Sequence, residues 1–495
     1  MSPQPLTKEP VSMQLKSVIQ GDQHGASGDK DTFKLVETVF RDYDIRGIAF
    51  TEINQEFALR LGKSLGQLTL ERDEDSIYVG RDGRLSSDKL TTSLCEGLLS
   101  SGCNVIDLGL TSTPILNFAI HHHGRSCCGV MVTASHNPGA YNGFKMVMQK
   151  VVVSSDEIQE LKGMMKANLF TPLTKGFFSS LDIMPQYLNY VIDNTEITHK
   201  FNLVIDGGNA VAGDIAARLF EQAGCHVERL FCDVDGDFPN HDPNPSNEKN
   251  LATLIERVKL NKADLGIALD GDGDRLVIIS GAGKIVWPDR LMMIFAQAIL
   301  PQNPGSIVVF DVKSSMRLKE FIIQNSGVPL LSKTGHSHIR QALIDSNAIL
   351  GGEFSGHIFF NDRWSGFDDG LYAAARLLEV LCNSDTDKVI SIDCMLSKFD
   401  NSCFTPEILV PIPETEKFEL MEKLTNYCNF GDAQITTLDG LRVERSQSWG
   451  LIRASNTTPN LTLRFEANNN MELKCIKAHF QNKLKPFIKK IEDYI

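Results

Sequence analysis

The segment SIYVGRD, residues 76–82, decides the fold class, because it joins β-branched and aromatic residues to a carboxylate at its end. This composition is typical of a buried strand that carries a polar group to the edge of a sheet. A helical stretch follows, and SGCNVI at 101–106 begins a second strand. The order of strand, helix and strand predicts a βαβ unit, the building block of mixed or parallel α/β sheets.

The same unit recurs twice along the chain. LVID at 203–206 and IVVFD at 307–311 are strands that again end in aspartate and precede a helical stretch. Their second strands begin with AGCHV at 223–227 and SGV at 326–328. Recurrence of one supersecondary unit indicates related domains. The sequence therefore predicts three related α/β domains.

Each copy carries one further apolar strand that ends in a polar loop. The three loops are TASHNP at 133–138, DGDGDR at 270–275 and GGEFSGH at 351–357. Ligands of open α/β sheets bind outside the carboxyl ends of the strands. Because the loops occupy equivalent places in three related sheets, we expect them to meet in one cleft.

Ser135 lies in the first of these loops, within MVTASHNPGAYNGFK at 131–145. Strand-like residues precede it, and the residues His136, Asn137 and Pro138 stop the strand and turn the backbone. We expect an exposed, well-aimed hydroxyl here, which suits an oxygen that accepts and donates a phosphoryl group. For this loop alone, a serine that caps a turn is the alternative.

The second loop places Asp270, Asp272 and Asp274 between two apolar strand-like runs. Three carboxylates cannot be buried together without a cation that offsets their repulsion. Hard oxygen ligands on a short loop suit Mg²⁺. A calcium-binding EF-hand would need glutamate at its twelfth position, where Gly281 stands. A solvated acidic turn disagrees with the apolar flanks, so we expect one Mg²⁺ per chain at the three aspartates.

Composition restricts the class of protein. The chain has 495 residues, 42 % hydrophobic residues and a formal net charge of −13, which argues against non-specific binding of nucleic acid or of an anionic membrane surface. No run approaches the roughly 18 apolar residues of a membrane span. Eleven cysteines without a CxxC pair predict reduced thiols in a cytoplasmic protein. Residues 1–31 are polar and lack the apolar core of a secretory signal, so we interpret them as a flexible extension.

The chain from Cys403 onward differs from the three copies. It has strand-like residues at 404–412, a hairpin at 433–443 and a basic amphipathic helix at 475–491, which predicts a smaller α+β domain. Its polar loop, RASNTTPN at 453–460, combines one arginine with hydroxyl and amide donors, the chemistry of a phosphate-binding loop. The expected domains, arranged around a central cleft, are the extension 1–31, the serine-loop domain 32–182, the acidic-loop domain 183–286, the third-loop domain 287–402 and the C-terminal domain 403–495.

Together the four loops resemble those of the α-D-phosphohexomutase superfamily, specifically its bacterial phosphomannomutase/phosphoglucomutase branch. The resemblance covers roughly residues 35–490, and FRDYDIRG at 40–47 and GRDGRLSS at 80–87 also match. RASNTTP favours this branch, because phosphoglucosamine mutases typically carry an SGTEP-like loop and classical phosphoglucomutases an SGTGS-like one. Phe354 departs from the pattern, which has methionine there, and residues 1–31 have no counterpart.

The resemblance implies an isomerase that feeds carbohydrate metabolism and the synthesis of nucleotide-sugar precursors. Its reaction interconverts the 1-phosphates and 6-phosphates of mannose or glucose through a phosphoserine at Ser135 and a hexose 1,6-bisphosphate, which also serves as activator. One oxygen of that phosphoryl group, carried by Ser135, joins the three aspartates around Mg²⁺. Lys145 and Arg46 place cations beside it, and His336 is the candidate general acid and base, with Lys145 as the rival.

The resemblance also assigns the substrate contacts. Glu353 and Ser355 recognise sugar hydroxyls that do not react, and Arg453 with its neighbours holds the phosphate that does not react. The implied partners are small hexose phosphates, and we expect a monomer, with a weak dimer as the alternative. The implied substrate-binding residues are Tyr43, Arg275, Lys313, His336, Glu353, Ser355, His357, Arg453, Ser455, Asn456 and Thr457.

Four other functions are considered. Within the family, the alternatives are a phosphoglucosamine mutase and a phosphoglucomutase restricted to glucose. A Mg²⁺-dependent sugar phosphatase of the haloacid-dehalogenase type would use an aspartate nucleophile near the start of its core, whereas the acidic loop here is central. A non-catalytic sugar-phosphate-binding protein would be expected to lose the serine or an aspartate, and this chain keeps all four.

Overall fold

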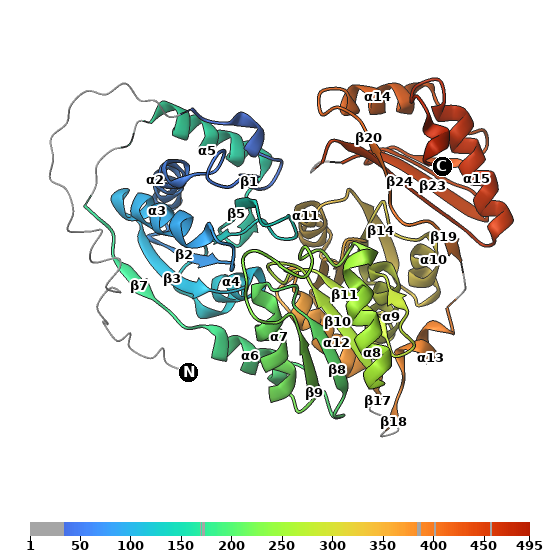
Figure 1. Cartoon of the computed structure of the whole chain (residues 1–495), viewed down its shortest axis with the longest axis horizontal. Coiled ribbons are helices and arrows are strands. Elements are labelled where there is room, and N and C mark those ends of the chain that lie inside the picture. The colour runs from blue at the N-terminus through green and yellow to red at the C-terminus, as the bar shows by residue number, and fades with distance from the viewer. Residues whose placement is uncertain (1–33, 169, 171–173, 384–387, 400–401, 456–457) are drawn as a thin grey trace.

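The computed structural model describes residues 34–168, 170, 174–383, 388–399, 402–455 and 458–495. The expected extension at 1–31 lies outside these residues. The chain forms three α/β domains and a C-terminal α+β domain, each around a sheet of its own, which confirms the predicted fold class. Figure 1 shows the first domain on one side, the second and third in the centre, and the fourth above the third.

Each of the first three sheets is built around the same trio of parallel strands. In the first domain, β2 (Ser76–Arg81) lies between β3 (Asn104–Leu110) and β4 (Gly129–Val132) and pairs with both in parallel. The helix α3 (Ser87–Ser100) connects β2 to β3, as predicted for a βαβ unit. The equivalent strands of the second domain are β8 (Asn202–Asp206), β9 (His226–Leu230) and β10 (Leu265–Leu269), and those of the third are β13 (Ile307–Asp311), β14 (Val328–Ser332) and β15 (Leu350–Gly352).

The three polar loops all connect the third strand of a trio to an antiparallel neighbour. The first loop joins β4 to β5 (Tyr141–Met148), and the second joins β10 to β11 (Leu276–Ser280). The third joins β15 to β16 (Ile358–Phe360). Each loop therefore starts at the carboxyl end of a parallel strand, where the fold places ligands.

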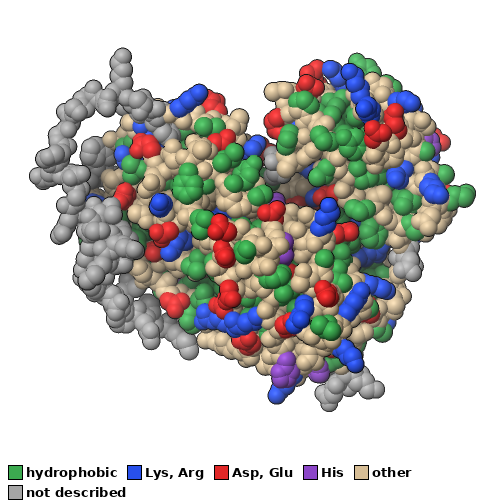
Figure 2. Space-filling view, in the orientation of Figure 1, with side chains coloured by type: hydrophobic (Ala, Val, Ile, Leu, Met, Phe, Trp, Pro, Cys, Tyr) green, Lys and Arg blue, Asp and Glu red, His purple; other side chains and the backbone are tan. Residues whose placement is uncertain are grey.

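The buried apolar side chains of the fourth domain are separate from the main core of the other three domains. One cluster of buried side chains runs through the first three domains, and the fourth domain has a cluster of its own. A further small cluster joins the third and fourth domains, and in it Trp449 and Leu451 of the fourth domain pack against Val312 and Met316 of the third. The fourth domain is therefore attached through a narrow apolar contact, and Figure 2 shows the surface hollowed between it and the first domain.

The fourth domain is an antiparallel sheet covered by two helices, α14 (Lys417–Tyr427) and α15 (Asn470–Leu484). Its central strands are β22 (Leu441–Glu444), β23 (Ser448–Ala454) and β24 (Asn460–Ala467). The outer strands are β19 (Cys403–Phe404), β20 (Ile408–Pro411) and β21 (Gln434–Thr436). The α+β character expected for this region is confirmed.

The predicted limits of two elements are wrong. The closing helix, expected at 475–491, begins at Asn470, because the side chain of Asn469 accepts hydrogen bonds from the first amides and caps it. It ends at Leu484, because Pro486 has no N–H with which to continue the helical hydrogen bonds. The strand expected at 404–412 is divided into β19 and β20, since Pro406 between them has no N–H to donate to the ladder.

No helix in the described part of the chain is both long enough and apolar enough to cross a membrane.

Helices α2 (Gln55–Glu71) and α3 approach closely, because glycines face each other across their contact. A Cβ added to Gly97 would lie 2.2 Å from the carbonyl oxygen of Leu59, and one added to Gly62 would lie 2.2 Å from that of Leu94. Both neighbours are backbone atoms, so neither helix can yield locally. Glycine at these positions sets the distance between the two helices.

We predict that Gly97→Ala lowers the free energy of unfolding by about 1–3 kcal/mol, because the added methyl overpacks the contact between α2 and α3. Gly163→Ala is the matched control, since Gly163 is exposed in α5 (Ser155–Ala167) and a Cβ there meets nothing within 4 Å. In the control, the free energy of unfolding should rise by up to about 1 kcal/mol, because alanine has a higher helix propensity than glycine. Chemical denaturation measures both, and equal changes in the two variants would contradict the tight contact.

Candidate active site

The first two polar loops meet at Ser135. Its Oγ donates a hydrogen bond to Asp270 Oδ2 at 2.7 Å, although the two residues belong to different domains. A Cβ on Gly271 would lie 2.2 Å from the carbonyl oxygen of Ser135, so only glycine permits this approach. Ser135 has a φ of 51°, a left-handed conformation that is uncommon for serine and is often found at functional sites.

The expectation that Ser135 is exposed is wrong, because its relative exposure is 1 %. The loop bearing Asp270 covers the hydroxyl, and His136 Nδ1 lies 3.2 Å from Oγ. This burial depends on a contact with another domain, which the local sequence around the serine does not encode. The hydroxyl is thus held in one orientation against a carboxylate.

The three aspartates of the second loop form a buried cluster. One oxygen from each of Asp270, Asp272 and Asp274 lies within 4.8 Å of the others. Among the described residues, Asp272 Oδ1 and Asp274 Oδ1 have no hydrogen-bond partner. Burial and the other two carboxylates raise the pKa of Asp270 above its ordinary value. Orphaned buried oxygens in an all-carboxylate donor set fit a hard divalent cation such as Mg²⁺.

Lys145, on β5, supplies a positive charge to the same cluster. Its Nζ lies 2.7 Å from Asp272 Oδ2 and 2.5 Å from Asp274 Oδ2. Burial alone lowers the pKa of this ammonium, but the three aspartates outweigh burial and raise it well above its ordinary value. Lys145 is therefore protonated at neutral pH and acts here as a fixed cation.

Arg46, on the neighbouring strand β1 (Ile45–Ile48), contacts the loop that carries Ser135. It donates to Asn137 Oδ1 at 2.8 Å and to Asp44 Oδ2 at 2.6 Å. Asn137 follows Ser135 by two residues, so the guanidinium lies beside the serine loop. A second cation is thus available next to the hydroxyl.

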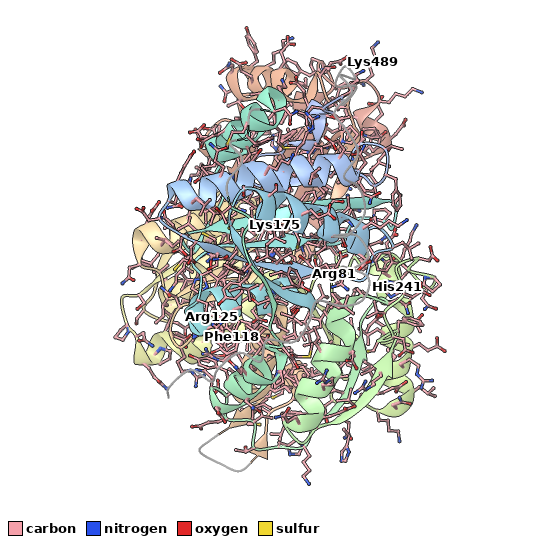
Figure 3. All side chains as sticks on the ribbon, turned by 90° about the vertical axis from the view of Figure 1, so that its left-hand side faces the viewer. Arg81, Phe118, Arg125, Lys175, His241 and Lys489 are labelled. Atoms are coloured by element: carbon pink, nitrogen blue, oxygen red, sulfur yellow. The ribbon has the colours of Figure 1, made fainter. Side chains whose placement is uncertain are left out.

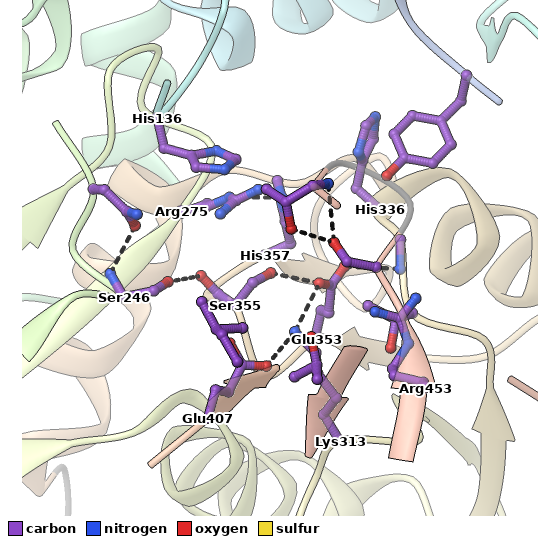
Figure 4. Close-up of a pocket in the computed structure, with 18 residues that line it drawn as sticks. His136, Ser246, Arg275, Lys313, His336, Glu353, Ser355, His357, Glu407 and Arg453 are labelled. Carbon is purple, nitrogen blue, oxygen red and sulfur yellow. Dashed lines mark hydrogen bonds and ion pairs between the residues drawn. The ribbon is translucent and has the colours of Figure 1, made fainter. Parts of the chain in front are cut away.

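A cavity of about 210 Å³ adjoins this cluster, and all four domains contribute to its wall. Figure 4 shows polar side chains of the four domains directed toward one another around it. The lining residues are Tyr43, His136, Asn244, Ser246, Arg275, Lys313, Thr334, Gly335, His336, Glu353, Ser355, His357, Glu407, Leu409, Arg453, Ser455, Thr458 and Thr462. The predicted meeting of the loops in one cleft is therefore observed.

Glu353 is the central acceptor of the cavity wall. Its carboxylate accepts from Ser355 Oγ at 2.7 Å and from the backbone N–H of Gly335 at 3.1 Å. Burial raises its pKa, but the ammonium of Lys313, 3.8 Å away, together with His357, Arg275 and the hydrogen bond from Ser355, outweighs burial and lowers the pKa to about 2. A carboxylate that remains ionised and fixed in this way is suited to accept hydrogen bonds from ligand hydroxyls.

Glu407 of the fourth domain faces Glu353 across the same lysine. Its Oε1 lies 3.2 Å from Lys313 Nζ, so one ammonium bridges carboxylates of two domains. The sequence offered no signal for Glu407, which belongs to no motif. His136 also lines the cavity and had no role in the sequence analysis, although it stands in the quoted serine loop. The remaining lining residues without a predicted role are Asn244, Ser246, Thr334, Gly335, Leu409, Thr458 and Thr462.

Two histidines lie between the acidic cluster and the cavity. Arg275 Nε donates to His357 Nε2 at 3.0 Å, and His357 Nδ1 lies 2.8 Å from Asp368 Oδ2. His336 begins α11 (His336–Ser346), and its ring meets that of Tyr43 edge-on at 4.7 Å. Burial lowers the pKa of His336 to about 4, so at neutral pH the ring is uncharged and can accept a proton.

The fourth domain contributes Arg453 at the end of β23. Its Nε donates to Asp439 Oδ2 at 3.0 Å, and its guanidinium reaches the cavity wall in Figure 4. Ser455 lines the same wall. Asn456 and Thr457, also expected in this loop, lie outside the described residues.

Arg84 holds the serine loop through hydrogen bonds to its backbone. It is buried, its Nε pairs with Asp82 Oδ2 at 3.0 Å, and its terminal nitrogens donate to four backbone carbonyls of the loop. Those acceptors are the carbonyl oxygens of Ser135, Asn137, Pro138 and Tyr141, at 2.6 to 3.1 Å. The motif GRDGRLSS was noted in the sequence, but it did not predict a role for Arg84. The acceptors of this arginine are backbone carbonyls, which every residue has, so the types of the side chains do not reveal them.

We predict that Arg84→Met lowers the free energy of unfolding by roughly 3–5 kcal/mol, because it leaves Asp82 and four carbonyls without their buried donor. Arg81→Met is the control, since Arg81, labelled in Figure 3, forms a partly exposed ion pair with Asp88 at 3.3 Å. In the control, the free energy of unfolding should fall by less than about 1 kcal/mol, because a surface ion pair contributes little stability. Urea denaturation compares the two, and a loss in Arg84→Met no larger than in the control would contradict the proposed support of the loop.

The chain is similar in sequence and structure to known proteins of one family. The family description "Phosphoglucomutase/phosphomannomutase, alpha/beta/alpha domain I" matches residues 37–171, and those of domains II and III match residues 185–283 and 287–394. A phosphomannomutase/phosphoglucomutase from Pseudomonas syringae pv. tomato is 45 % identical over 451 residues, which cover 91 % of this chain and 96 % of that protein.

Two further similar proteins carry names of the same family. A phosphoglucomutase from Neisseria meningitidis serogroup A is 42 % identical over 451 residues, covering 90 % of this chain and 96 % of that protein. The crystal structure of a phosphoglucomutase/phosphomannomutase family protein from Burkholderia thailandensis superposes with a TM-score of 0.86 at 38 % identity, covering 92 % of this chain and 99 % of that one.

Proposed function

Because the chain belongs to the phosphoglucomutase/phosphomannomutase family of α-D-phosphohexomutases, we propose that it is an isomerase that interconverts the 1-phosphates and 6-phosphates of mannose and glucose. The observation that carries this proposal is the hydrogen bond between Ser135 and Asp270, next to a polar cavity that four domains line. A hydroxyl, a cluster of carboxylates and several cations lie together there, as phosphoryl transfer requires.

Ser135 is the proposed carrier of the phosphoryl group. In the first transfer, the bond between phosphorus and Ser135 Oγ breaks, and a bond forms to the free hydroxyl oxygen of a hexose monophosphate. The hydroxyl proton passes to His336, which burial keeps uncharged and which lines the cavity. The product is a hexose 1,6-bisphosphate, which must turn around before its other phosphoryl group returns to Ser135.

Charge neutralisation is the proposed role of the groups around the serine. Asp270, Asp272 and Asp274, with an oxygen of the phosphoryl group on Ser135, would hold Mg²⁺. When bound, Mg²⁺ supplies positive charge that stabilises the transferring phosphoryl group. Lys145 and Arg46 add fixed positive charge on the same side, and Arg275 lies on the side of the cavity.

Recognition of the sugar is assigned to the third domain and recognition of the distal phosphate to the fourth. Glu353 and Ser355 are proposed to bind hydroxyls that do not react, which lets one site accept the sugar in two orientations. Arg453 and Ser455 are proposed to hold the phosphate that is not transferred, through charge-assisted hydrogen bonds. Further proposed contacts come from Tyr43, Lys313, His357, and from Asn456 and Thr457.

We further propose a monomer that acts in the cytoplasm on free hexose phosphates. Described residues from all four domains of one chain line the cavity, which supports a site within a single copy. The eleven cysteines lie in the described part of the chain as free thiols, which is consistent with a reducing compartment. The proposed division into domains remains 32–182, 183–286, 287–402 and 403–495.

A phosphoglucomutase restricted to glucose is the second candidate, because the Neisseria relative carries that name alone. A coupled assay that compares mannose 1-phosphate, glucose 1-phosphate and glucosamine 1-phosphate separates it from the first. Turnover of both mannose and glucose phosphates supports the proposal, and turnover of glucose 1-phosphate alone supports the second candidate.

We predict that Ser135→Ala loses most activity and all phosphate at this position, because the hydroxyl is the acceptor of the phosphoryl group. Intact-mass and peptide analysis should find sub-stoichiometric phosphate on Ser135 of the wild-type protein. Ser180→Ala, an exposed serine on β7 (Phe178–Ser180), is the matched control and should retain full activity. Phosphate found only on an aspartate would rule the carrier role out.

We predict that Asp272→Asn weakens Mg²⁺ binding and lowers turnover by roughly two orders of magnitude, because one of three converging carboxylates loses its charge. Titration calorimetry with Mg²⁺ measures the binding, and a coupled assay measures the turnover. Asp237→Asn, on an exposed loop of the second domain, should change neither. Full turnover of the wild-type protein in excess EDTA would contradict the metal assignment.

A further inference from the structure

Phe354 stands between two residues of the cavity wall but does not belong to that wall. Glu353 and Ser355 both line the cavity, whereas Phe354 is absent from its wall and is 7 % exposed, with the ammonium of Lys313 6.0 Å from its ring centroid. The ring of Trp287 stacks against that of Phe354, with centroids 5.7 Å apart. Phe354 is also the position at which the chain departs from the family pattern described above.

A further neighbour of this ring comes from another domain. Arg464, on β24 of the fourth domain, places its Cζ 3.5 Å from the centroid of Phe354. The guanidinium is buried, with 2 % exposure, so water does not screen this contact. A desolvated guanidinium over an aromatic face is a strong form of the cation–π interaction.

The same guanidinium also holds the loop that carries Lys313. Arg464 donates one hydrogen bond to the backbone carbonyl of Lys313 and another to Asp289 Oδ2 at 3.2 Å. The ammonium of Lys313 lines the cavity and pairs with Glu353. One arginine of the fourth domain thus contacts two of the three segments of the third domain that line the cavity.

We propose that Phe354 and Arg464 form a cation–π contact that aligns the sugar-recognition loop with the fourth domain. Both are positioning residues, because neither reaches the cavity and each acts through Glu353, Ser355 and Lys313. The proposal rests on the sugar-binding role assigned to that loop. Loss of the contact frees the loop to shift, which weakens binding of the sugar and leaves the transfer step at Ser135 unchanged.

The test is a double-mutant cycle with Phe354→Met and Arg464→Lys. Methionine keeps an apolar side chain without an aromatic face, and lysine keeps the charge without the planar donors. Each single variant should raise KM for glucose 1-phosphate about tenfold, with kcat changed less than about twofold. The double variant should be no worse than the more affected single variant, because both changes remove the same contact.

Two controls separate this effect from general weakening of the domain contact. Lys319→Met removes an ion pair between the same two domains, with Glu444 at 3.6 Å, and should leave KM unchanged. Phe354→Tyr keeps the aromatic face and should behave as wild type. If Arg464→Lys does not fold, the comparison of Phe354→Met with Phe354→Tyr decides, and equal KM values in the two would overturn the proposal.

A measurement without turnover distinguishes this proposal from the proposed function. Amide hydrogen exchange at residues 353–357 should accelerate in Phe354→Met and Arg464→Lys but not in Lys319→Met. Unchanged exchange, or additive effects in the cycle, would overturn the alignment role even if the wild-type protein is an active mutase. Accelerated exchange in a protein without mutase activity would support the contact and reject the proposed function alone.

Discussion

Three carboxylates buried side by side are the constraint on which the rest of this site depends. Asp270, Asp272 and Asp274 repel one another, and burial strengthens that repulsion, so the fold must bring positive charge to them. Lys145 arrives from the sheet of the first domain and pairs with two of them. Two of their oxygens have no hydrogen-bond partner in the described structure, which suits the cluster to a divalent cation. The contact between the first two domains follows from this requirement, and the hydroxyl of Ser135 is fixed within it.

In the proposed function, the first two domains carry the phosphoryl group and the metal ligands, and the third supplies both the proton acceptor His336 and the sugar contacts. The first and second domains hold the serine, the carboxylates and the cations, whereas the third and fourth supply most of the cavity wall. The fourth domain has its own core and contacts the third through a small apolar cluster and through buried arginines. A domain attached in this way can change its position while the reacting groups stay in place, which suits a reaction whose intermediate must turn around.

Features encoded by local patterns were predicted from the sequence, and features that depend on distant contacts were not. The trio of parallel strands and the polar loop after each third strand follow from short runs such as SIYVGRD and IVVFD, so the fold class was accessible. The burial of Ser135 was not, because Asp270 of another domain covers it. Glu407 and Arg464 gave no signal for the same reason: their partners are a lysine, a carbonyl and a ring in another domain.

The central claim is that Ser135 carries the phosphoryl group that reaches the sugar. The most direct measurement is a single turnover of enzyme that bears a radiolabelled phosphoryl group on Ser135, mixed with unlabelled glucose 1-phosphate and quenched at intervals. We expect that the label leaves Ser135 and appears first in hexose 1,6-bisphosphate and then in glucose 6-phosphate, without release of inorganic phosphate. Product formation while the label stays on Ser135, or loss of the label as inorganic phosphate, would contradict it.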